Sequence, residues 1–378
     1  MNIQNMDEII DGFIENIVLK STAENPLWNS ENKVFSKVNR WNYIDACMIK
    51  AITKLYEIKG DESLFYFAKN YTDSFISEEN TISSMNPEAY NLDNINGGKN
   101  LLYFYKKTTD EKYLEASKWI YENQLKKQPR LKCGNFWHKL IYPNQIWLDG
   151  IYMTMPFLAE YSELNKNKEM IDDIKCQIEM IRKYMKSEET GLYYHGYDEE
   201  KTTCWANKKT GLSSEYWLRS MGWLTAGLVD TYEITDNNDL KNLTADMLGN
   251  LLESLIKYQD ENGMFYQLPI KKRISGNYQE TSGTALYTYS ALKSYRLGIC
   301  SEEIKNSGIK ALNGIIENYI DMNGNMPILK NICLVAGLGG EQNRDGSEQY
   351  YLNEPIVQND AKGIAPFIMA YTEYIAMS

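Results

Sequence analysis

The chain has 378 residues, of which 43% are hydrophobic and 24% are charged, a balance typical of a soluble globular protein with a large core. Its formal net charge of −11 disfavours nucleic acid as a partner, because the overall field repels phosphates and no stripe of basic residues offsets it. The six cysteines form no CxxC pair and there are only two histidines, which indicates neither a zinc cluster nor a disulfide framework.

The N-terminal stretch "MNIQNMDEIIDGFIENIVLK" alternates acidic and apolar residues at helical spacing. It has no basic leading segment, and no continuous apolar run as long as a signal peptide or a membrane span. We therefore expect a cytoplasmic protein with no membrane partner.

A helical hairpin recurs along the chain, marked by the polar turn between its two helices. These turns begin at Tyr56, Tyr105, Tyr161, Tyr232 and Tyr295. Each follows an apolar helix and leads into a second helix whose Asp, Glu or Ser suits an N-terminal turn. Together with an opening helix near residues 6–19 and a closing helix near 357–376, the five hairpins predict an all-α fold of twelve helices.

The links between hairpins are far longer than the turns within them. They cover roughly residues 82–92, 127–146, 188–216, 260–279 and 321–356. If the helices pair regularly and close into a ring, the short turns lie at one end and the long loops, which we expect to carry the function, at the other. Strand-like pieces at 191–197 and 263–270 are suited to small hairpins. No linker divides the chain, so we expect one domain over residues 1–378.

Polar residues interrupt the apolar pattern where each long loop leads into the next helix. The six segments are "RWNYID" (40–45), "YNLDNINGGK" (90–99), "WLDGIYM" (147–153), "WLRSMGW" (217–223), "QETSGTALY" (279–287) and "QNDAKGIAPF" (358–367). An isolated Asp in the first turn of a helix is more often a cap than a catalyst. Six polar helix starts at one end of a ring nevertheless favour a shared site.

Asp149 begins one of these helices, two positions after Trp147. The positive end of the helix dipole favours its carboxylate, whereas nearby aromatic side chains favour the neutral acid by desolvation. Asp93 is the natural second carboxylate, and two carboxyl groups in an aromatic pocket suit acid and base chemistry on sugars.

Arg219, between Trp217 and Trp223, has two interpretations of similar weight. It is either a structural cation stacked on indole or a fork that binds a carboxylate. His138 and His195 lie in long loops among aromatic residues, where a histidine is more often a packing residue than a functional one.

At the level of whole motifs the chain resembles the unsaturated rhamnogalacturonyl hydrolases of glycoside hydrolase family 105. The matching segments, in chain order, are "NLDNIN", "FWHKLIYPNQIWLDGIYM", "YYHGYD", "WLRSMGW", "ETSGTALYTYSAL" and "GLGGEQNRDGSEQYYLNEPIVQNDAKGIAPF". They span residues 91–367, and the ordered set is much more specific than any one of them. The resemblance implies an (α/α)6 barrel of six helical hairpins, which agrees with the repeat.

Enzymes of that family act on a sugar acid whose C4=C5 double bond is conjugated to its carboxylate, and they hydrate this bond. The resemblance implies that Asp149 is the general acid/base, which protonates C4 and helps water add at C5. The resulting hemiketal opens and expels the neighbouring sugar. By the same resemblance Asp93 binds ring hydroxyls and assists Asp149. Because the double bond is hydrated and the glycosidic carbon is not attacked, the carboxylate-spacing rule of ordinary glycosidases does not apply.

The resemblance also implies substrate contacts. His195 would contact the sugar near the reacting centre, while Arg219 and Trp223 would line the uronate subsite. Further residues of the pocket lining would be Trp147, Trp217, Lys139, Tyr43 and His138. Leu218 departs from the family pattern, in which a smaller residue precedes the arginine. No metal or organic cofactor is implied.

The preferred substrate is thus unsaturated galacturonyl-rhamnose from pectin breakdown, and the expected partner is only this small oligosaccharide, with the protein a monomer or a weak homo-oligomer. One alternative is an unsaturated glucuronyl hydrolase on glycosaminoglycan or ulvan fragments. A sugar 2-epimerase would need paired histidines in motifs that this chain does not resemble. A non-catalytic sugar-binding helical scaffold would use the long-loop end as a docking surface.

Overall fold

Six helices form the inner ring of an (α/α)6 barrel in the computed structural model, which describes residues 3–377. They are α3 (Tyr43–Lys59), α5 (Gly98–Thr108), α7 (Asp149–Asn165), α9 (Leu218–Ile234), α11 (Thr281–Arg296) and α14 (Ala361–Ala376). Each contacts the next in this order, and α14 contacts α3, so the ring is closed. Their sequences are apolar almost all round, as expected of helices with neighbours on every side.

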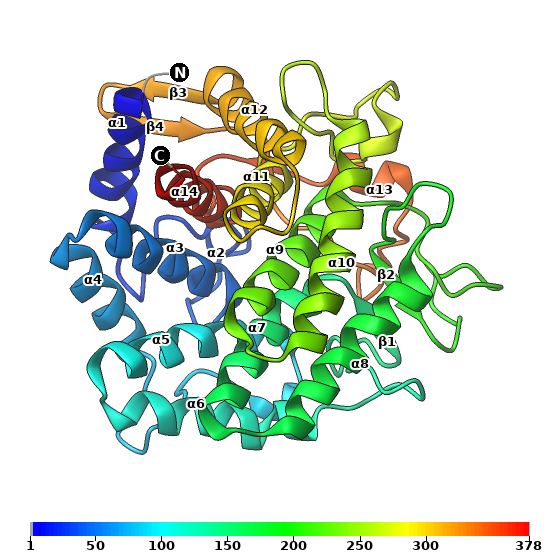
Figure 1. The fold of residues 1–378 in the computed structure, drawn as a ribbon, viewed down its shortest axis with the longest axis horizontal. Helices are drawn as coiled ribbons and strands as arrows, with labels where there is room; N and C mark the ends of the chain where they lie inside the picture. The colour runs from blue at the N-terminus through cyan, green and yellow to red at the C-terminus, as the bar shows by residue number, and fades with distance from the viewer. Residues whose placement is uncertain (1–2, 378) are drawn as a thin grey trace.

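Six further helices lie at the periphery (Figure 1). They are α1 (Ile3–Phe13), α4 (Glu62–Asp73), α6 (Glu111–Asn123), α8 (Lys168–Met185), α10 (Asn238–Leu255) and α12 (Glu302–Tyr319). In α8 the buried residues Ile171, Ile174, Ile178 and Ile181 follow the spacing of one helical face. The outer helices therefore cover the ring with one apolar stripe each.

The predicted turns are confirmed at all five hairpins, where an inner helix ends and an outer helix begins within a few residues. Side-chain caps start four of the outer helices: Asp61 accepts from the backbone N–H of Ser63 at 2.9 Å, and Asp110, Asn167 and Asn237 cap the next three in the same way. The predicted opening helix corresponds to α1 and a π-helical turn over Ile14–Val18.

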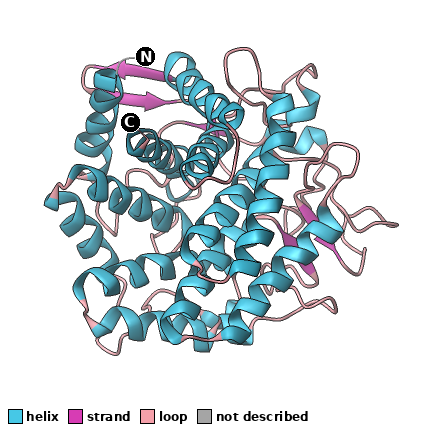
Figure 2. Cartoon of the chain, in the orientation of Figure 1, coloured by secondary structure: helices cyan, strands magenta, loops and turns pink. Residues whose placement is uncertain are grey.

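The described part of the chain also contains short elements that the hairpin repeat did not predict. Two are the helices α2 (Ser30–Val34) and α13 (Glu348–Asn353). The strands, magenta in Figure 2, form three two-stranded antiparallel sheets: β1 (Gln145–Trp147) with β2 (Gly196–Asp198), β3 (Ile320–Asn323) with β4 (Met326–Leu329), and β5 (Ile332–Cys333) with β6 (Ile356–Val357).

The two strand-like pieces differ from the expected small hairpins. Residues 191–197 contribute part of β2, whose ladder partner β1 belongs to a different long loop. Residues 263–270 form no strand; they contain one isolated bridge, between Tyr266 and Gln279, and enter a 3₁₀ turn at Pro269. Short strands here join loops that are distant in sequence, which local alternation does not reveal.

Glycines allow the inner helices to approach each other closely. A methyl group at Gly227 of α9 would lie 2.8 Å from the backbone nitrogen of Tyr152 in α7. On the other side of α9, a methyl group at Gly283 would lie 2.5 Å from Cγ of Leu218. Leu218 is thus packed against α11, where the glycine leaves room for it. None of the helices within residues 3–377 has the length and apolar character that a bilayer span requires.

Candidate active site

The six polar segments predicted from the sequence all lie at the N-terminal starts of the inner helices. All six inner helices begin within their quoted segments, at Tyr43, Gly98, Asp149, Leu218, Thr281 and Ala361. A 3₁₀ turn that holds Asp93 lies directly before Gly98. Because the long loops enter at this end, the ten predicted site residues lie on the inner-helix starts or on the loops that lead to them.

The β1–β2 ladder joins the two loops that carry Asp149 and His195. In this ladder Trp147 is opposite Gly196, and the backbone N–H of Leu148 donates to the carbonyl of His195 at 3.1 Å. Helix α7 begins one residue later, at Asp149. The ladder therefore sets the position of His195 relative to the first residue of α7.

Asp149, His195 and Tyr351 form a row of three polar side chains. His195 Nε2 lies 3.4 Å from Asp149 Oδ2, and His195 Nδ1 lies 2.7 Å from the hydroxyl of Tyr351. The imidazole is fully buried, whereas the Asp149 side chain keeps 13% exposure. Asp149 Oδ2 and His195 Nε2 are both buried and have no shorter hydrogen bond within the described residues, so these two atoms face each other.

Asp149 is held as a carboxylate in the free protein. Burial acts to raise its pKa, but His195, His138 and a backbone hydrogen bond together outweigh burial and lower the pKa below its ordinary value. Burial raises the pKa of Tyr351 well above its usual range, so its hydroxyl keeps its proton. A group that could protonate a substrate must therefore gain its proton when the ligand binds.

Asp93 belongs to a second polar cluster beside the first. Its carboxylate lies 2.5 Å from Lys139 Nζ and 3.5 Å from His138 Nε2. The cluster is linked to the loop by a hydrogen bond from the Leu92 N–H to the His138 carbonyl at 3.1 Å. Burial would lower the pKa of Lys139, but Asp93 raises it overall, so the lysine remains an ammonium.

His138 lies between the two aspartates. It is 3.5 Å from Asp93, and its charge would also act on Asp149. Burial is the main cause that lowers the pKa of His138 from 6.5 to about 4, so the imidazole is neutral at physiological pH. A neutral His138 can donate or accept a hydrogen bond without adding charge to the site.

Aromatic rings form a wall across this end of the barrel. Trp147 stacks on His138 at 4.5 Å between ring centroids and on Tyr142 at 4.7 Å. On the other side of His195, Trp217 lies 4.8 Å from the imidazole. Such rings provide the flat apolar surfaces on which sugar rings pack.

Arg219 is a buried guanidinium without a carboxylate partner within ion-pair distance among residues 3–377; only 1% of it is exposed. It stacks on Trp217 at 4.7 Å and donates to Ser282 Oγ at 3.2 Å and to the carbonyl of Cys333. Its Nε has no partner within the same residues. Burial acts to lower its pKa, but nearby acidic groups, chiefly Cys333 and Glu280, outweigh it and raise the pKa, so the guanidinium stays charged.

Trp223 and Tyr43 complete the set of predicted residues. Their rings meet edge to face at 6.5 Å, and Trp223 also packs on Tyr152 at 4.8 Å. The Tyr43 hydroxyl donates to Glu31 Oε1 at 3.4 Å, and burial raises the pKa of Tyr43 well above its usual range. Arg219 acts to lower that pKa and Asp93 to raise it, so Tyr43 is within electrostatic range of both.

Tyr351 is the residue that sequence reasoning missed. It lies in the segment that carries the family resemblance, but no local pattern distinguishes it from the adjacent Tyr350. Only the fold brings α13 against His195. Within the described residues no group of three His, Cys, Asp or Glu side chains is placed to hold a metal ion.

Comparison with known proteins identifies the family. A sequence model described as Glycosyl Hydrolase Family 88 matches residues 13–378. A solved family 105 glycoside hydrolase from C. acetobutylicum ATCC 824 is 37% identical, with a TM-score of 0.88 over 98% of this chain and 99% of that one. Protein Atu3128 of Agrobacterium fabrum is 35% identical over 233 residues, which are 60% of this chain and all (100%) of that protein.

A more distant relative has a more specific name. The unsaturated rhamnogalacturonyl hydrolase YesR of Bacillus subtilis is 23% identical over 255 residues, which cover 63% of this chain and 70% of YesR. The match to the family model covers nearly the whole chain, and the 37% identical structure shares its helical barrel. The chain therefore belongs to the glycoside hydrolases of families 88 and 105.

Proposed function

We propose that this protein removes a 4,5-unsaturated uronic acid from the non-reducing end of small oligosaccharides by hydrating the C4=C5 double bond. The observation that carries this proposal is Arg219, a buried cation that lacks a carboxylate partner within residues 3–377. A buried charge is costly unless it is paired, and a guanidinium fork matches a carboxylate. The substrate's carboxylate would supply the missing partner.

The reaction begins with proton transfer from Asp149 to C4. The bound uronate brings a second negative charge and displaces water, and both effects raise the pKa of Asp149 so that it carries a proton. Protonation of C4 leaves an oxocarbenium ion at C5, stabilised by the ring oxygen. His195, beside Asp149 at 3.4 Å, holds the carboxyl group in place.

Water then completes the hydration. The oxygen of a water molecule bonds to C5 while the Asp149 carboxylate accepts a proton from that water. This step regenerates the acid and gives a hemiketal. The hemiketal ring opens to a C5 ketone, and C1 becomes a hemiacetal that expels the neighbouring sugar as an alcohol. Asp93, held by Lys139 at 2.5 Å, would accept hydrogen bonds from ring hydroxyls during these steps.

Rhamnogalacturonan fragments are the proposed source of the substrate. The motif set and the named relative YesR both support unsaturated galacturonyl-rhamnose as the disaccharide. The loss of ultraviolet absorbance from the conjugated double bond measures the reaction directly. Purified protein should remove this signal from unsaturated galacturonyl-rhamnose and leave that of an unsaturated chondroitin disaccharide.

The two disaccharides separate the substrate from the mechanism. If only the absorbance of the unsaturated chondroitin disaccharide falls, the protein hydrates the double bond but its substrate comes from glycosaminoglycans. If folded protein changes neither signal, hydration of unsaturated uronates is not its activity.

A further inference from the structure

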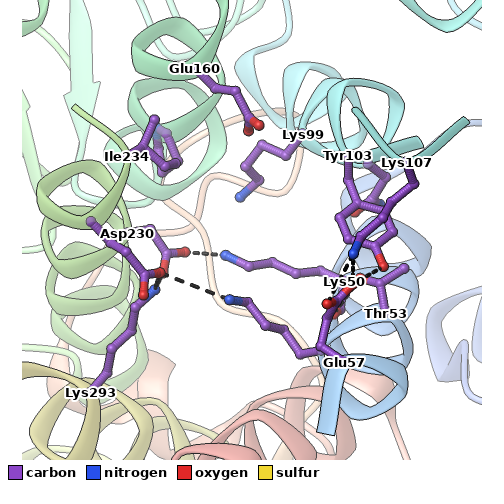
Figure 3. Close-up of a pocket in the computed structure, with 14 residues that line it drawn as sticks. Lys50, Thr53, Glu57, Lys99, Tyr103, Lys107, Glu160, Asp230, Ile234 and Lys293 are labelled. Carbon is purple, nitrogen blue, oxygen red and sulfur yellow. Dashed lines mark hydrogen bonds and ion pairs between the residues drawn. The ribbon is translucent and has the colours of Figure 1, made fainter. Parts of the chain in front are cut away.

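A polar cavity lies at the end of the barrel opposite the candidate active site, where the short turns join the helices. It has a volume of about 330 Å³ and is drawn in Figure 3. Its lining contains five lysines and four carboxylates: Lys50, Lys54, Lys99, Lys107, Lys293, Glu57, Glu160, Asp230 and Glu233. A volume of this size accommodates a monosaccharide-sized ligand.

Most of these charges neutralise each other. Asp230 pairs with Lys50 and, at 2.6 Å, with Lys293, which also lies 2.7 Å from Glu233. Lys107 pairs with Glu57 at 2.8 Å. The carboxylates are further shared with cations outside the lining, since Lys106 lies 2.6 Å from Glu160 and Arg296 lies 2.9 Å from Glu233. Every carboxylate of the cavity lining is therefore already paired with a cation other than Lys54 or Lys99.

Lys99 is the lysine that this arrangement leaves without a carboxylate. It is 7% exposed, and Figure 3 shows its ammonium pointing into the cavity with no dashed line to any drawn residue. Its one hydrogen bond within the described residues is to the carbonyl of Tyr152 at 3.0 Å. The amine also lies over the Tyr152 ring, 3.6 Å from the ring centroid. An ammonium has three N–H donors, and these two contacts leave at least one of them for a ligand.

Pro156 explains the one bond that Lys99 makes. A proline has no N–H, so at position 156 it cannot donate to the carbonyl four residues earlier, which is that of Tyr152. Lys99 supplies the missing donor from α5. This structural role uses a single N–H. Burial, followed by the charge of Lys50, lowers the pKa of Lys99 well below its ordinary value, so an anion beside the amine would favour its charged form. A neutral donor such as glutamine would serve the Tyr152 carbonyl equally well.

Lys54 faces the same cavity from α3. Its ammonium is 3.9 Å from Glu233, beyond hydrogen-bond distance, and Glu233 is already bonded to Lys293 and Arg296. Burial also lowers the pKa of Lys54. Lys54 and Lys99 are thus two amines, on different helices around one cavity, that have no hydrogen-bonded carboxylate within the described residues.

We propose that this cavity is an anion-binding site, separate from the candidate active site, that holds a small oxyanion between Lys99 and Lys54. Two kinds of ligand share this chemistry, inorganic phosphate and the carboxylate of an acidic sugar. Either would accept a hydrogen bond from an unused N–H of Lys99 and would favour the charged form of both amines. This site does not depend on the proposed hydrolase activity.

Titration calorimetry on the full-length protein tests the site with inorganic phosphate, galacturonate and neutral galactose. Lys99→Gln keeps a donor for the Tyr152 carbonyl and removes the charge, while Lys54→Gln changes the half-buried lysine on α3. Lys118→Gln, an exposed lysine that pairs with Glu115, is the matched control. We expect each cavity variant to weaken binding of at least one anion tenfold or more, with the control unchanged and galactose unbound in the cavity.

The strongest anion identifies the ligand. A preference for phosphate points to inorganic phosphate, and a preference for galacturonate points to an acidic sugar. The proposal is overturned if neither anion binds at millimolar concentration, or if both cavity variants bind as wild type does. Binding of galactose with the same dependence on Lys99 would also overturn it. Hydrolysis, assayed in parallel, should be unchanged in these variants. Failure of the anion-site proposal would therefore be distinguishable from failure of the proposed hydrolase activity.

Discussion

The hydroxyl of Tyr351 lies 2.7 Å from Nδ1 of His195, and the other ring nitrogen of this histidine faces Asp149 at 3.4 Å. The Asp149 carboxylate can only accept a hydrogen bond, so the tautomer of a neutral His195 that suits it has Nδ1 free to accept from the Tyr351 hydroxyl. A neutral imidazole that accepts at Nδ1 carries its proton on Nε2, where it points towards Asp149. Tyr351 therefore selects the tautomer of His195 that stabilises the Asp149 carboxylate.

Removing the Tyr351 hydroxyl tests this positioning role. Tyr351→Phe should lower kcat roughly tenfold, the scale expected when the hydrogen-bond partner of an active-site histidine is lost. KM should change little, and the pH profile of kcat/KM should shift because Nδ1 is free to take the proton. Tyr278→Phe is the control, since the buried Tyr278 hydroxyl has no hydrogen-bond partner within the described residues. An unchanged pH profile in Tyr351→Phe would exclude the positioning role.

Asp149→Asn tests the proposed acid/base. The amide cannot transfer a proton, so we expect kcat to fall by about a hundredfold or more, the usual contribution of general acid–base catalysis. The ultraviolet assay measures this loss, and a thermal unfolding curve checks that the variant is folded. Asp172→Asn, on the exposed face of α8, should behave as wild type. Substantial turnover by folded Asp149→Asn would assign the proton transfer to another group.

Arg219→Lys tests recognition of the substrate's carboxylate. Lysine keeps the charge but lacks the planar fork, and loss of a charged hydrogen bond costs about 1.5–3 kcal/mol. We therefore expect the unsaturated uronate to bind roughly ten- to a hundredfold more weakly. Titration with Asp149→Asn as the background prevents turnover. Arg182→Lys, an exposed arginine paired with Asp246, is the control. Equal affinity in both variants would show that Arg219 is only a structural cation.

His138 makes stability depend on pH. Its pKa is about 4 in the folded protein and 6.5 in its ordinary state, so below pH 6.5 the unfolded chain binds a proton that the folded protein does not. Stability is therefore complete above pH 6.5 and is lost as the pH falls towards 4. At about pH 5 the loss relative to pH 7 should be on the order of 2 kcal/mol.

Urea unfolding of wild type and His138→Gln at these two pH values isolates this contribution. Glutamine does not titrate, so the variant should lose less stability than wild type between pH 7 and pH 5. Other groups titrate equally in both proteins and cancel in the comparison. Parallel losses would mean that His138 is not the buried neutral group.

The helical barrel was predictable because its signals are local. Asp61 and Asp110 cap the outer helices a few residues after the inner ones end, and each polar helix start lies next to its own apolar run. These signals need no knowledge of distant segments. The placement of Asp149, Asp93 and the tryptophans at one end followed from the same reasoning, while their catalytic roles remain predictions.

Contacts between distant loops were not predictable. Tyr351 meets His195, and Arg219 meets the Cys333 carbonyl, only after the whole ring has closed. No periodicity or spacing links such pairs in the sequence. The hydrogen bond from Lys99 to the Tyr152 carbonyl was predictable in part. Pro156 within a helix indicates that the carbonyl four residues earlier lacks its helical donor, but which residue donates instead depends on how α5 packs against α7.

The β1–β2 ladder has an evolutionary consequence. It holds Asp149 and His195 together at the bases of two loops, so their relative position is set by backbone pairing and not by the residues farther out along either loop. If the proposed roles of this pair are correct, insertions or exchanges beyond the ladder, such as in residues 199–213, would leave the acid/base geometry unchanged. A barrel built this way can diversify its substrates through its outer loops while one reaction is inherited unchanged.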